Sequence, residues 1–188
     1  LLIDGEPLVE PDFSANHLRM AAFLLDKELP EDPYSELVDT LDDVDRGMVK
    51  LVVTQCFGAL DRRQLGGLTG KFHTRYIGGT AAKFTAIRNA LSKRYPWTED
   101  VFFCDVGAHL QYLEGEMALK MMAWAMAHDV PLLPVHDAYA VPERYEAMTE
   151  QAMGMVWDVV MRDARDRNDL LKKACSRASL MYEYSKQR

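Results

Sequence analysis

The chain has 188 residues, enough for one domain with a sizeable core, and its 48% hydrophobic and 27% charged residues are ordinary for a globular protein. No apolar run approaches the roughly 20 residues that span a membrane, and no signal peptide is visible, so we expect no membrane partner and a cytoplasmic location. The net charge of -7, taken over the whole chain, disfavours nucleic acid as a partner.

The first 25 residues predict a strand, a turn, a second strand and a helix. Asp4-Gly5 is a hairpin signal between two short extended runs, and the second run ends at Asp12. Ser14 can cap the helix that follows. Asp12 is therefore expected where a strand gives way to a helix, as a carboxylate on a rigid support. Because the chain begins with Leu rather than Met, we expect it to be the C-terminal part of a longer chain with an upstream domain or partner.

A helix is predicted over about 44–60, because apolar residues recur on one face of it. Arg46 and Lys50 lie four residues apart on another face, with no acid at that spacing. Two cations on one face suit a polyphosphate. A solvent-exposed Arg/Lys pair is the commoner explanation of such a face, and both interpretations stay open.

Basic residues are concentrated between Asp61 and Tyr95. The eight of them are Arg62, Arg63, Lys71, Arg75, Lys83, Arg88, Lys93 and Arg94. With Asp61 as the only acid, the segment carries +7 and the rest of the chain -14. Such a segment can bind a phosphate backbone, or it can be a solvated face. Its five glycines, at 66, 67, 70, 78 and 79, match no phosphate-loop pattern, so we interpret them as turns.

The second half predicts a strand, a long helix, a hairpin and two more helices. The strand covers 101–104, and the long helix covers 108–128, with Gln111 and Glu114 off its apolar stripe. His136 and Asp137 interrupt two apolar runs in 131–142, which predicts a hairpin of buried strands with a carboxylate at its tip. The next helix, 142–162, is expected to turn Tyr145, Met148, Ala152, Met155 and Val159 inward, and the last covers 169–184. The three cysteines, at 56, 104 and 175, are expected to be buried reduced thiols.

Three motifs in this order resemble the palm and fingers of family A (DNA polymerase I-like) polymerases. The first is Asp12-Phe13-Ser14-Ala15-Asn16-His17-Leu18-Arg19. The second is Arg46, Lys50 and Phe57-Gly58. The third is His136-Asp137, preceded by a Gln-bearing helix that Gln111 matches. Together they cover most of the chain, as one polymerase-like module of the compact, divergent kind found in phages and mobile elements.

The resemblance implies template-directed nucleotidyl transfer with two Mg²⁺ (or Mn²⁺) ions. Asp12 and Asp137, with the backbone carbonyl of Phe13, would hold the metals, and His136 would contact the phosphate at the primer end. Nucleoside triphosphate would bind through Arg46, Lys50, His17 and an aromatic ring, Phe57 or, as a second choice, Tyr139. The contacts to a DNA primer-template would come from Arg19, Arg62, Arg63, Lys71, Arg75 and Gln111.

The elements and the resemblance together predict an α/β (α+β) fold. It has a small antiparallel, palm-like sheet packed by helices, and a helical fingers subregion over approximately 43–100. Four features differ from the family pattern. Thr54 occupies the position of an aromatic residue, and the aromatic-Gly pair, Phe57-Gly58, lies one residue closer to Lys50 than in the pattern. His17 replaces a Glu that screens the sugar, and Ala138 replaces the Glu that usually follows the hairpin Asp. These changes leave the choice between deoxy- and ribonucleotides open.

Three alternatives remain open from the sequence. A polymerase-like module can lose catalysis and keep the binding of nucleotide or nucleic acid. A metal-dependent phosphohydrolase could use His136 and Asp137, although the other four histidines show no ligand spacing. Finally, Asp12 and Asp137 can have only structural roles, as a helix cap and a turn residue.

Overall fold

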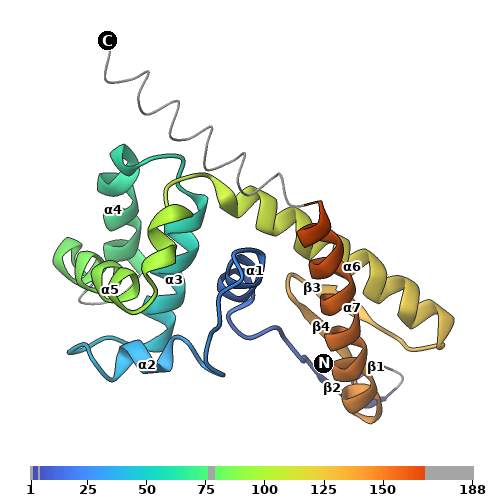
Figure 1. The fold of residues 1–188 in the computed structure, drawn as a ribbon. Coiled ribbons are helices and arrows are strands. Elements are labelled where there is room, and N and C mark those ends of the chain that lie inside the picture. Colours follow the sequence, from blue (N-terminus) through green and yellow to red (C-terminus); the bar gives the residue numbers. More distant parts are fainter. Residues whose placement is uncertain (1, 4, 76–78, 168–188) are drawn as a thin grey trace. The chain divides into compact units, whose positions relative to one another are not determined.

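The structure is a computed structural model that describes residues 2–3, 5–75 and 79–167 (Figure 1). Its fold is α+β, as the sequence predicts: seven α-helices and a small antiparallel sheet are present in the described ranges. The chain divides into two compact units. We call 1–16 with 110–167 the sheet unit, and 17–109 the helical unit. No helix in the described ranges combines the length and the apolar character needed to cross a membrane.

The sheet has the strand order β1-β2-β4-β3, and every neighbouring pair is antiparallel. The strands are β1 (Leu2–Ile3), β2 (Glu6–Val9), β3 (Leu133–Val135) and β4 (Ala138–Pro142). Gly5 lies in the turn between β1 and β2 with φ +82°, a backbone conformation that glycine adopts without strain. Both predicted hairpins are therefore confirmed. β2 pairs with β4 through Val9 and Val141, which places the N-terminal strands beside a hairpin more than 120 positions away.

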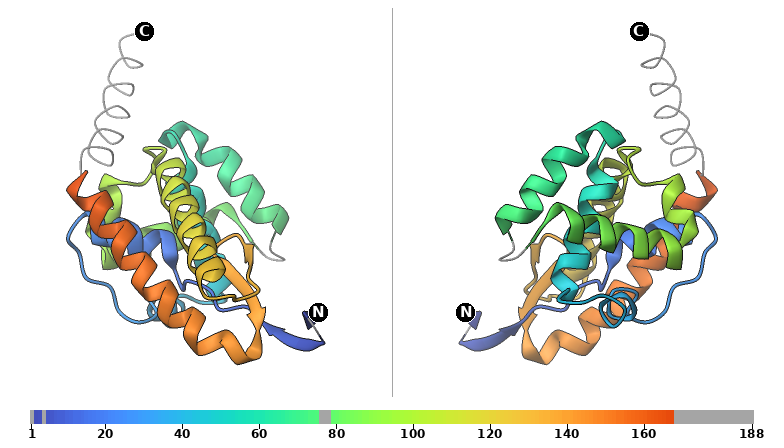
Figure 2. Two further views of the ribbon diagram at one scale, coloured as in Figure 1. Left: turned by 90° about the vertical axis from the view of Figure 1, so that its right-hand side faces the viewer. Right: turned by 90° about the vertical axis from the view of Figure 1, so that its left-hand side faces the viewer.

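The core of the sheet unit lies between β4 and two long helices, α6 (Val106–Ala127) and α7 (Glu146–Asp166). Tyr139 of β4 packs with Met121 of α6 and Met153 of α7, and Val141 packs with Ala125. A short 3₁₀ turn, η3 (Glu143–Tyr145), joins β4 to α7, as both views of Figure 2 show. Alternate residues of β4 thus face the helices, as expected for a strand with one covered face.

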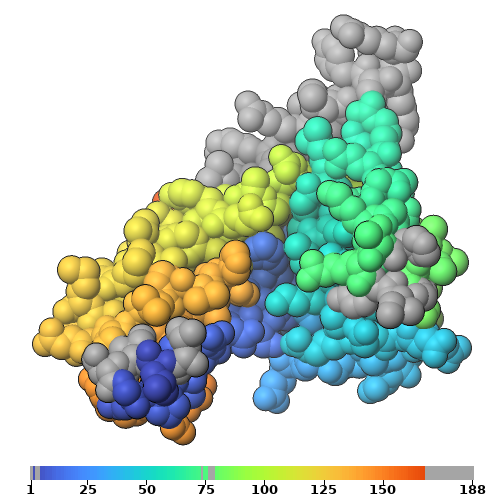
Figure 3. Space-filling model, turned by 180° about the vertical axis from the view of Figure 1, so that it is seen from behind, coloured from blue at the N-terminus to red at the C-terminus, as the bar shows by residue number. Residues whose placement is uncertain are grey.

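Two details of the sheet unit correct the sequence analysis. The strand β3 is not buried, because Leu133 and Val135 are 48% and 44% exposed; Figure 3 shows the hairpin at the surface in orange. The helix α7 turns Thr149, Ala152, Met153 and Val160 inward, while Met148, Met155 and Val159 are exposed. The helix carries two apolar stripes, and periodicity does not show which of them meets the sheet.

The helical unit contains most of α1 (Asn16–Leu24), whose first residue is counted with the sheet unit. Its other elements are α2 (Ser35–Val38), α3 (Arg46–Gly58), η1 (Arg62–Gln64), α4 (Leu65–Arg75), α5 (Ala81–Arg94) and η2 (Pro96–Asp100). The segment predicted as fingers, 43–100, lies within this unit. Side chains at the ends of two helices cap them: Asp45 accepts a hydrogen bond from the N–H of Met48, and Thr80 from that of Lys83.

The core of the helical unit is built by α3, α4 and α5, which pack on one another (Figure 2). The apolar stripe predicted for α3 is confirmed: Met48, Val49, Val52, Val53 and Cys56 are all buried. Phe72 of α4 meets Phe84 of α5 edge to face, with ring centroids 5.8 Å apart.

Two predictions for this unit are wrong. The glycines at 66, 67 and 70 lie within α4 and not in turns. The predicted strand 101–104 is a turn, in which Phe103 has φ +62° and donates its N–H to the carbonyl of Cys56 at 2.8 Å.

Of the three cysteines, Cys56 is buried and Cys104 is half-buried, and both are free thiols. Burial raises the pKa of the Cys56 thiol to about 12. Cys175 and the predicted helix 169–184 lie outside the described residues.

Candidate functional site

The structure places Asp12 and Asp137 on neighbouring segments, although 125 positions separate them in the sequence. Asp12 forms an antiparallel bridge with Ala138. On either side of it, the N–H of Phe13 donates to the carbonyl of Asp137 at 3.4 Å, and the N–H of Tyr139 donates to that of Pro11 at 3.0 Å. The backbone of 11–13 is therefore hydrogen-bonded to that of 137–139, which places Asp12 and Asp137 on paired segments. Their joint role as metal ligands stays a prediction.

A two-residue turn presents Asp137. Val135 pairs with Ala138, so His136 and Asp137 are the only residues between β3 and β4. His136 has φ +57°, a conformation that glycine usually supplies at this position of a hairpin. Positive φ in a residue with a side chain is strained, and strain of this kind is concentrated at functional sites. The histidine is exposed and the aspartate is half-buried.

Aromatic residues anchor both aspartates to the core. Phe13 follows Asp12 directly, and its ring meets that of Tyr139 edge to face, with centroids 6.3 Å apart. Tyr139 is 1% exposed and belongs to the core between β4, α6 and α7. Packing therefore fixes Phe13 and Tyr139, the aromatic residues that flank the paired segments, while Asp12 itself is exposed.

The electrostatic surroundings of Tyr139 are negative. Burial, followed by the carboxylates of Glu114 and Asp137, raises the pKa of its hydroxyl to about 12. The hydroxyl therefore keeps its proton at neutral pH and adds no charge.

The donor atoms available here fit Mg²⁺ or Mn²⁺ better than Zn²⁺. Asp12 and Asp137 supply carboxylate oxygens, and the carbonyl of Phe13 belongs to the same paired segment. Within the described ranges, no three His, Cys, Asp or Glu side chains gather as a closed metal site would require. Mg²⁺ commonly binds through one or two carboxylates, with water and substrate phosphates as its other ligands, so a pair of aspartates suits it.

The resemblance identifies Gln111 as the polar residue of α6, but the structure points to the residue one turn later. Gln111 is exposed. Glu114 is half-buried and accepts a hydrogen bond at 3.1 Å from Asn16. The carbonyl oxygen of the Asn16 side chain accepts from the indole N–H of Trp157 at 3.2 Å. Sequence reasoning gave no role to Trp157 or to Asn16, although Asn16 lies within the first motif, because the two residues are 141 positions apart.

The predicted triphosphate ligands, Arg46 and Lys50, belong to the helical unit. The sequence shows no acid at helical spacing from Arg46, but the structure provides one from a distant loop. The Nε of Arg46 donates to Asp32 at 3.0 Å, and its guanidinium lies 5.3 Å from the ring centre of Tyr34. Lys50 is exposed and forms no ion pair within the described ranges. His17, the residue at the sugar-screening position, is half-buried on α1. The nucleotide-binding roles of these residues stay predictions.

The stacking role predicted for Phe57 does not fit its position. Phe57 is completely buried and meets Phe102 edge to face, with ring centroids 5.1 Å apart. Tyr139, the second choice, is also buried. A nucleobase could stack on either ring only after the core around it had opened, so both rings serve the core in this structure.

The predicted nucleic-acid ligands divide into engaged and available cations. Arg62 pairs with Glu99, and Arg63 donates from its Nε to Asp61 at 2.9 Å. Arg19 donates to the carbonyls of Pro30 and Glu31, which ties the following loop to α1.

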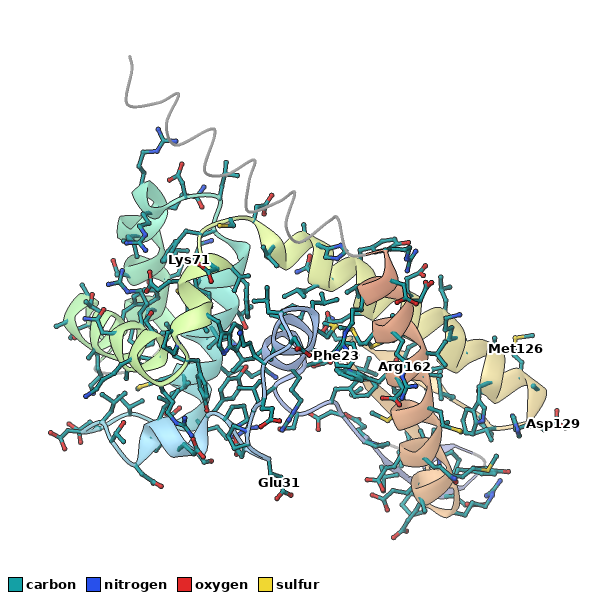
Figure 4. The ribbon with its side chains drawn as sticks, viewed as in Figure 1. Phe23, Glu31, Lys71, Met126, Asp129 and Arg162 are labelled. Atoms are coloured by element: carbon teal, nitrogen blue, oxygen red, sulfur yellow. The ribbon has the colours of Figure 1, made fainter. Side chains whose placement is uncertain are left out.

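Two further cations lie on α4. Lys71 (labelled in Figure 4) and Arg75 are exposed, and neither forms an ion pair in the part of the chain that the structure describes. They are the residues of the predicted set that can most readily contact phosphate.

Two surface cavities lie in the helical unit, and no predicted site residue lines either of them. One, of about 630 Å³, lies between α2 and the last turn of α5; the other, of about 480 Å³, is lined by 27–30 and 94–97. Arg94 borders both, and in the first it pairs with Glu36 at 2.9 Å. Both cavities contain acids and bases, so their charge does not indicate one class of ligand.

Comparisons of this chain with models of protein families, with curated proteins and with solved structures give no match.

Proposed function

We propose that this chain is a polymerase-like nucleotidyltransferase module that acts on a DNA primer-template and nucleoside triphosphates. One observation carries the proposal. Asp12, after a short strand, pairs with Ala138 in an antiparallel bridge, and the N–H of Phe13 donates to the carbonyl of Asp137 in the adjoining hairpin turn. The two aspartates come from the first and the third of the ordered motifs, at distant places in the chain. A cytoplasmic location, where these substrates are found, goes with the proposal.

In the proposed reaction, a primer 3′-oxygen forms a bond to the α-phosphorus of the triphosphate while the bond to pyrophosphate breaks. Bound Mg²⁺ would supply stabilisation of negative charge on the attacking and leaving oxygens. Asp12, Asp137 and the carbonyl of Phe13 would hold the metal ions. His136 would contact the primer-end phosphate from the hairpin turn. Arg46 and Lys50 would bind the triphosphate, since phosphoryl transfer depends mostly on positioning and charge neutralisation.

The experiment is extension of a labelled primer-template with Mg²⁺ or Mn²⁺ and either dNTPs or rNTPs. We expect Asp12→Asn and Asp137→Asn each to lower the rate by more than about a hundredfold, because the charge that holds the metal is lost while the shape is kept. Asp129→Asn is the matched control. Asp129 is an exposed aspartate of the same unit, just beyond α6 (Figure 4), and its φ of +53° suits Asn equally well.

Extension by the wild type and the control, lost in both site variants, supports the proposal, and the preferred sugar would show what His17 does. Extension that survives in Asp12→Asn and Asp137→Asn contradicts it. The same is true if the wild type extends no primer with either metal.

A second candidate function is binding of nucleotide or nucleic acid without catalysis. Two observations favour it: His17 and Ala138 occupy positions where the family pattern has glutamates. Binding of a triphosphate by a wild type that extends no primer would support this function, and calorimetric titration with dNTP and Mg²⁺ measures it.

A further inference from the structure

A buried asparagine connects three separate parts of the sheet unit. Asn16, the first residue of α1, is 4% exposed. Its Nδ2 donates to Oε1 of Glu114 on α6 at 3.1 Å, and its Oδ1 accepts from Nε1 of Trp157 on α7 at 3.2 Å. Because indole is only a donor and carboxylate only an acceptor, the orientation of the amide is determined by its partners.

Burial of an amide and a carboxylate is costly, and an apolar residue would fill the same space without that cost. Hydrogen bonds repay the cost only while their geometry is kept. A network of this kind therefore favours one relative placement of the three segments over others that would pack equally well.

The placement matters because Asn16 lies four residues after Asp12. The backbone around Asp12 is hydrogen-bonded to the hairpin, and the side chain of Asn16 is hydrogen-bonded to α6 and α7. Between these two fixed points, Ala15 has φ +53°, a strained conformation for any residue but glycine. Such strain persists when the structure on both sides holds it.

We propose that Asn16 is a positioning residue for the metal-binding carboxylate of Asp12, acting through Glu114 and Trp157; this rests on the proposed function. The amide holds the end of the Asp12 segment against α6 and α7. Two attachments then set the position of Asp12 relative to Asp137: the backbone pairing of 11–13 with 137–139, and the hydrogen bonds of Asn16 to α6 and α7.

A charge-swap cycle tests this role. Asn16→Asp places a second carboxylate against Glu114 and should weaken the hydrogen-bond network of residue 16 through repulsion. Adding Glu114→Gln to Asn16→Asp restores the network with donor and acceptor exchanged. The new amide at position 114 can donate to the new carboxylate at position 16, and Trp157 still donates to that carboxylate. Trp157→Phe is a milder variant that removes one N–H and keeps the ring.

The readouts are the primer-extension rate, the KM for primer-template and the Mg²⁺ concentration for half-maximal rate. In the single variant Asn16→Asp we expect a rate about 10 to 100 times lower and a higher Mg²⁺ requirement, with the KM for primer-template unchanged. The double variant should recover to within about threefold of the wild type, and Trp157→Phe should lie between them.

A purely structural role predicts a different result. Thermal stability would then fall in Asn16→Asp, but the rate per folded molecule and the Mg²⁺ requirement would stay at wild-type values well below the melting temperature. That result, or a double variant that is no better than the single one, overturns the positioning role and leaves the proposed function standing.

Failure of the proposed function is visible separately, as a wild type that extends no primer. Mn²⁺ binding, followed by the loss of the free-ion signal in electron paramagnetic resonance, then decides the inference. The positioning role of Asn16 is supported if Asn16→Asp binds Mn²⁺ more weakly and Glu114→Gln in the same chain restores binding. Equal binding by the wild type and Asn16→Asp rejects that role.

Discussion

At the scale of single residues, Asp32 is the partner that the sequence did not reveal. It lies in the loop between Pro30 and Pro33, and it accepts hydrogen bonds from the hydroxyl of Ser35 at 2.8 Å and from Nε of Arg46 at 3.0 Å. Burial raises the pKa of Asp32, but the hydrogen bonds from Ser35, Arg46 and two backbone N–H groups outweigh burial and lower it to about 2. The ionised form of Asp32 therefore stabilises the folded state.

The lowered pKa predicts how stability depends on pH. A carboxyl with a pKa of about 2 when folded and 3.8 when unfolded stabilises the protein above pH 4, and this contribution is lost as the pH falls through about 2. Because the side chain of Asp32 is 37% exposed, solvent screens part of this stabilisation. We therefore expect Asp32→Asn to lower the free energy of unfolding by about 1 kcal/mol at pH 7.

Urea unfolding of the wild type and Asp32→Asn, from pH 7 to pH 2.5, measures this contribution. The difference in the free energy of unfolding should shrink below pH 4. Asp42→Asn is the control, since Asp42 is exposed and forms no ion pair within the described ranges. A difference that stays constant down to pH 2.5 would contradict the assigned cause.

At the scale of elements, packing overrides local preference. The three glycines of α4 each cost about 1 kcal/mol of helix propensity relative to alanine, so local preference disfavours a helix there. The helix forms because Leu68 and Phe72 are buried in the helical unit, where Phe72 meets Phe84. The turn 101–104 has the same cause: burial of Phe102 and Phe103 holds a backbone that β-propensity alone would extend.

Two glycines of α6 give opposite predictions. A Cβ on Gly107 would lie 3.1 Å from the Cα and N of Gly58, whereas a Cβ on Gly115 meets nothing within 4 Å. Gly107→Ala should therefore lower the free energy of unfolding by about 1–3 kcal/mol, because backbone atoms must move apart. Gly115→Ala should raise it by about 0.5–1 kcal/mol through helix propensity.

Chemical denaturation of both variants beside the wild type measures the two effects. The pair is matched in chemistry and in helix, so only the space around the new methyl group differs. Effects of the same sign would show that α3 and α6 do not approach each other as closely as the structure has them.

At the scale of the whole molecule, charge is distributed unevenly. The chain carries -7 overall and its 61–95 segment +7, but ion pairs to Glu99, Asp61 and Glu36 engage three of the cations in that segment. Among the predicted nucleic-acid ligands, Lys71 and Arg75 on α4 are exposed and form no ion pair within the described ranges. If the chain binds DNA, these two should contribute more than the paired Arg62 and Arg63, and binding should weaken strongly with salt.

The salt dependence of DNA binding tests that distribution. For a fluorescent single strand between 25 and 200 mM salt, replacing both Lys71 and Arg75 by Ala should reduce the slope of log affinity against log salt concentration by about 1.4, or about 0.7 per phosphate contact. The matched double variant, Arg62→Ala with Arg63→Ala, removes two paired cations and should change the slope by less. Equal changes in the two would show that ion pairing does not decide which cations meet phosphate.

What the sequence determined by itself is local. Periodicity and turn chemistry predicted the two hairpins, the long α6 and the buried stripe of α3, because each depends on residues close together in the chain. The resemblance added the expectation that Asp12 and Asp137 hold the metals together, and the strand pairing places their backbone segments side by side.

Only the tertiary structure decided the rest. Partners distant in the sequence make the hydrogen bonds of Asn16 and the ion pair between Asp32 and Arg46, and they bury Phe57. The inward face of α7 is a choice between two apolar faces of one helix. Pattern and propensity describe a residue together with its near neighbours. Which face is buried, and which charge is paired, is settled by packing between distant segments.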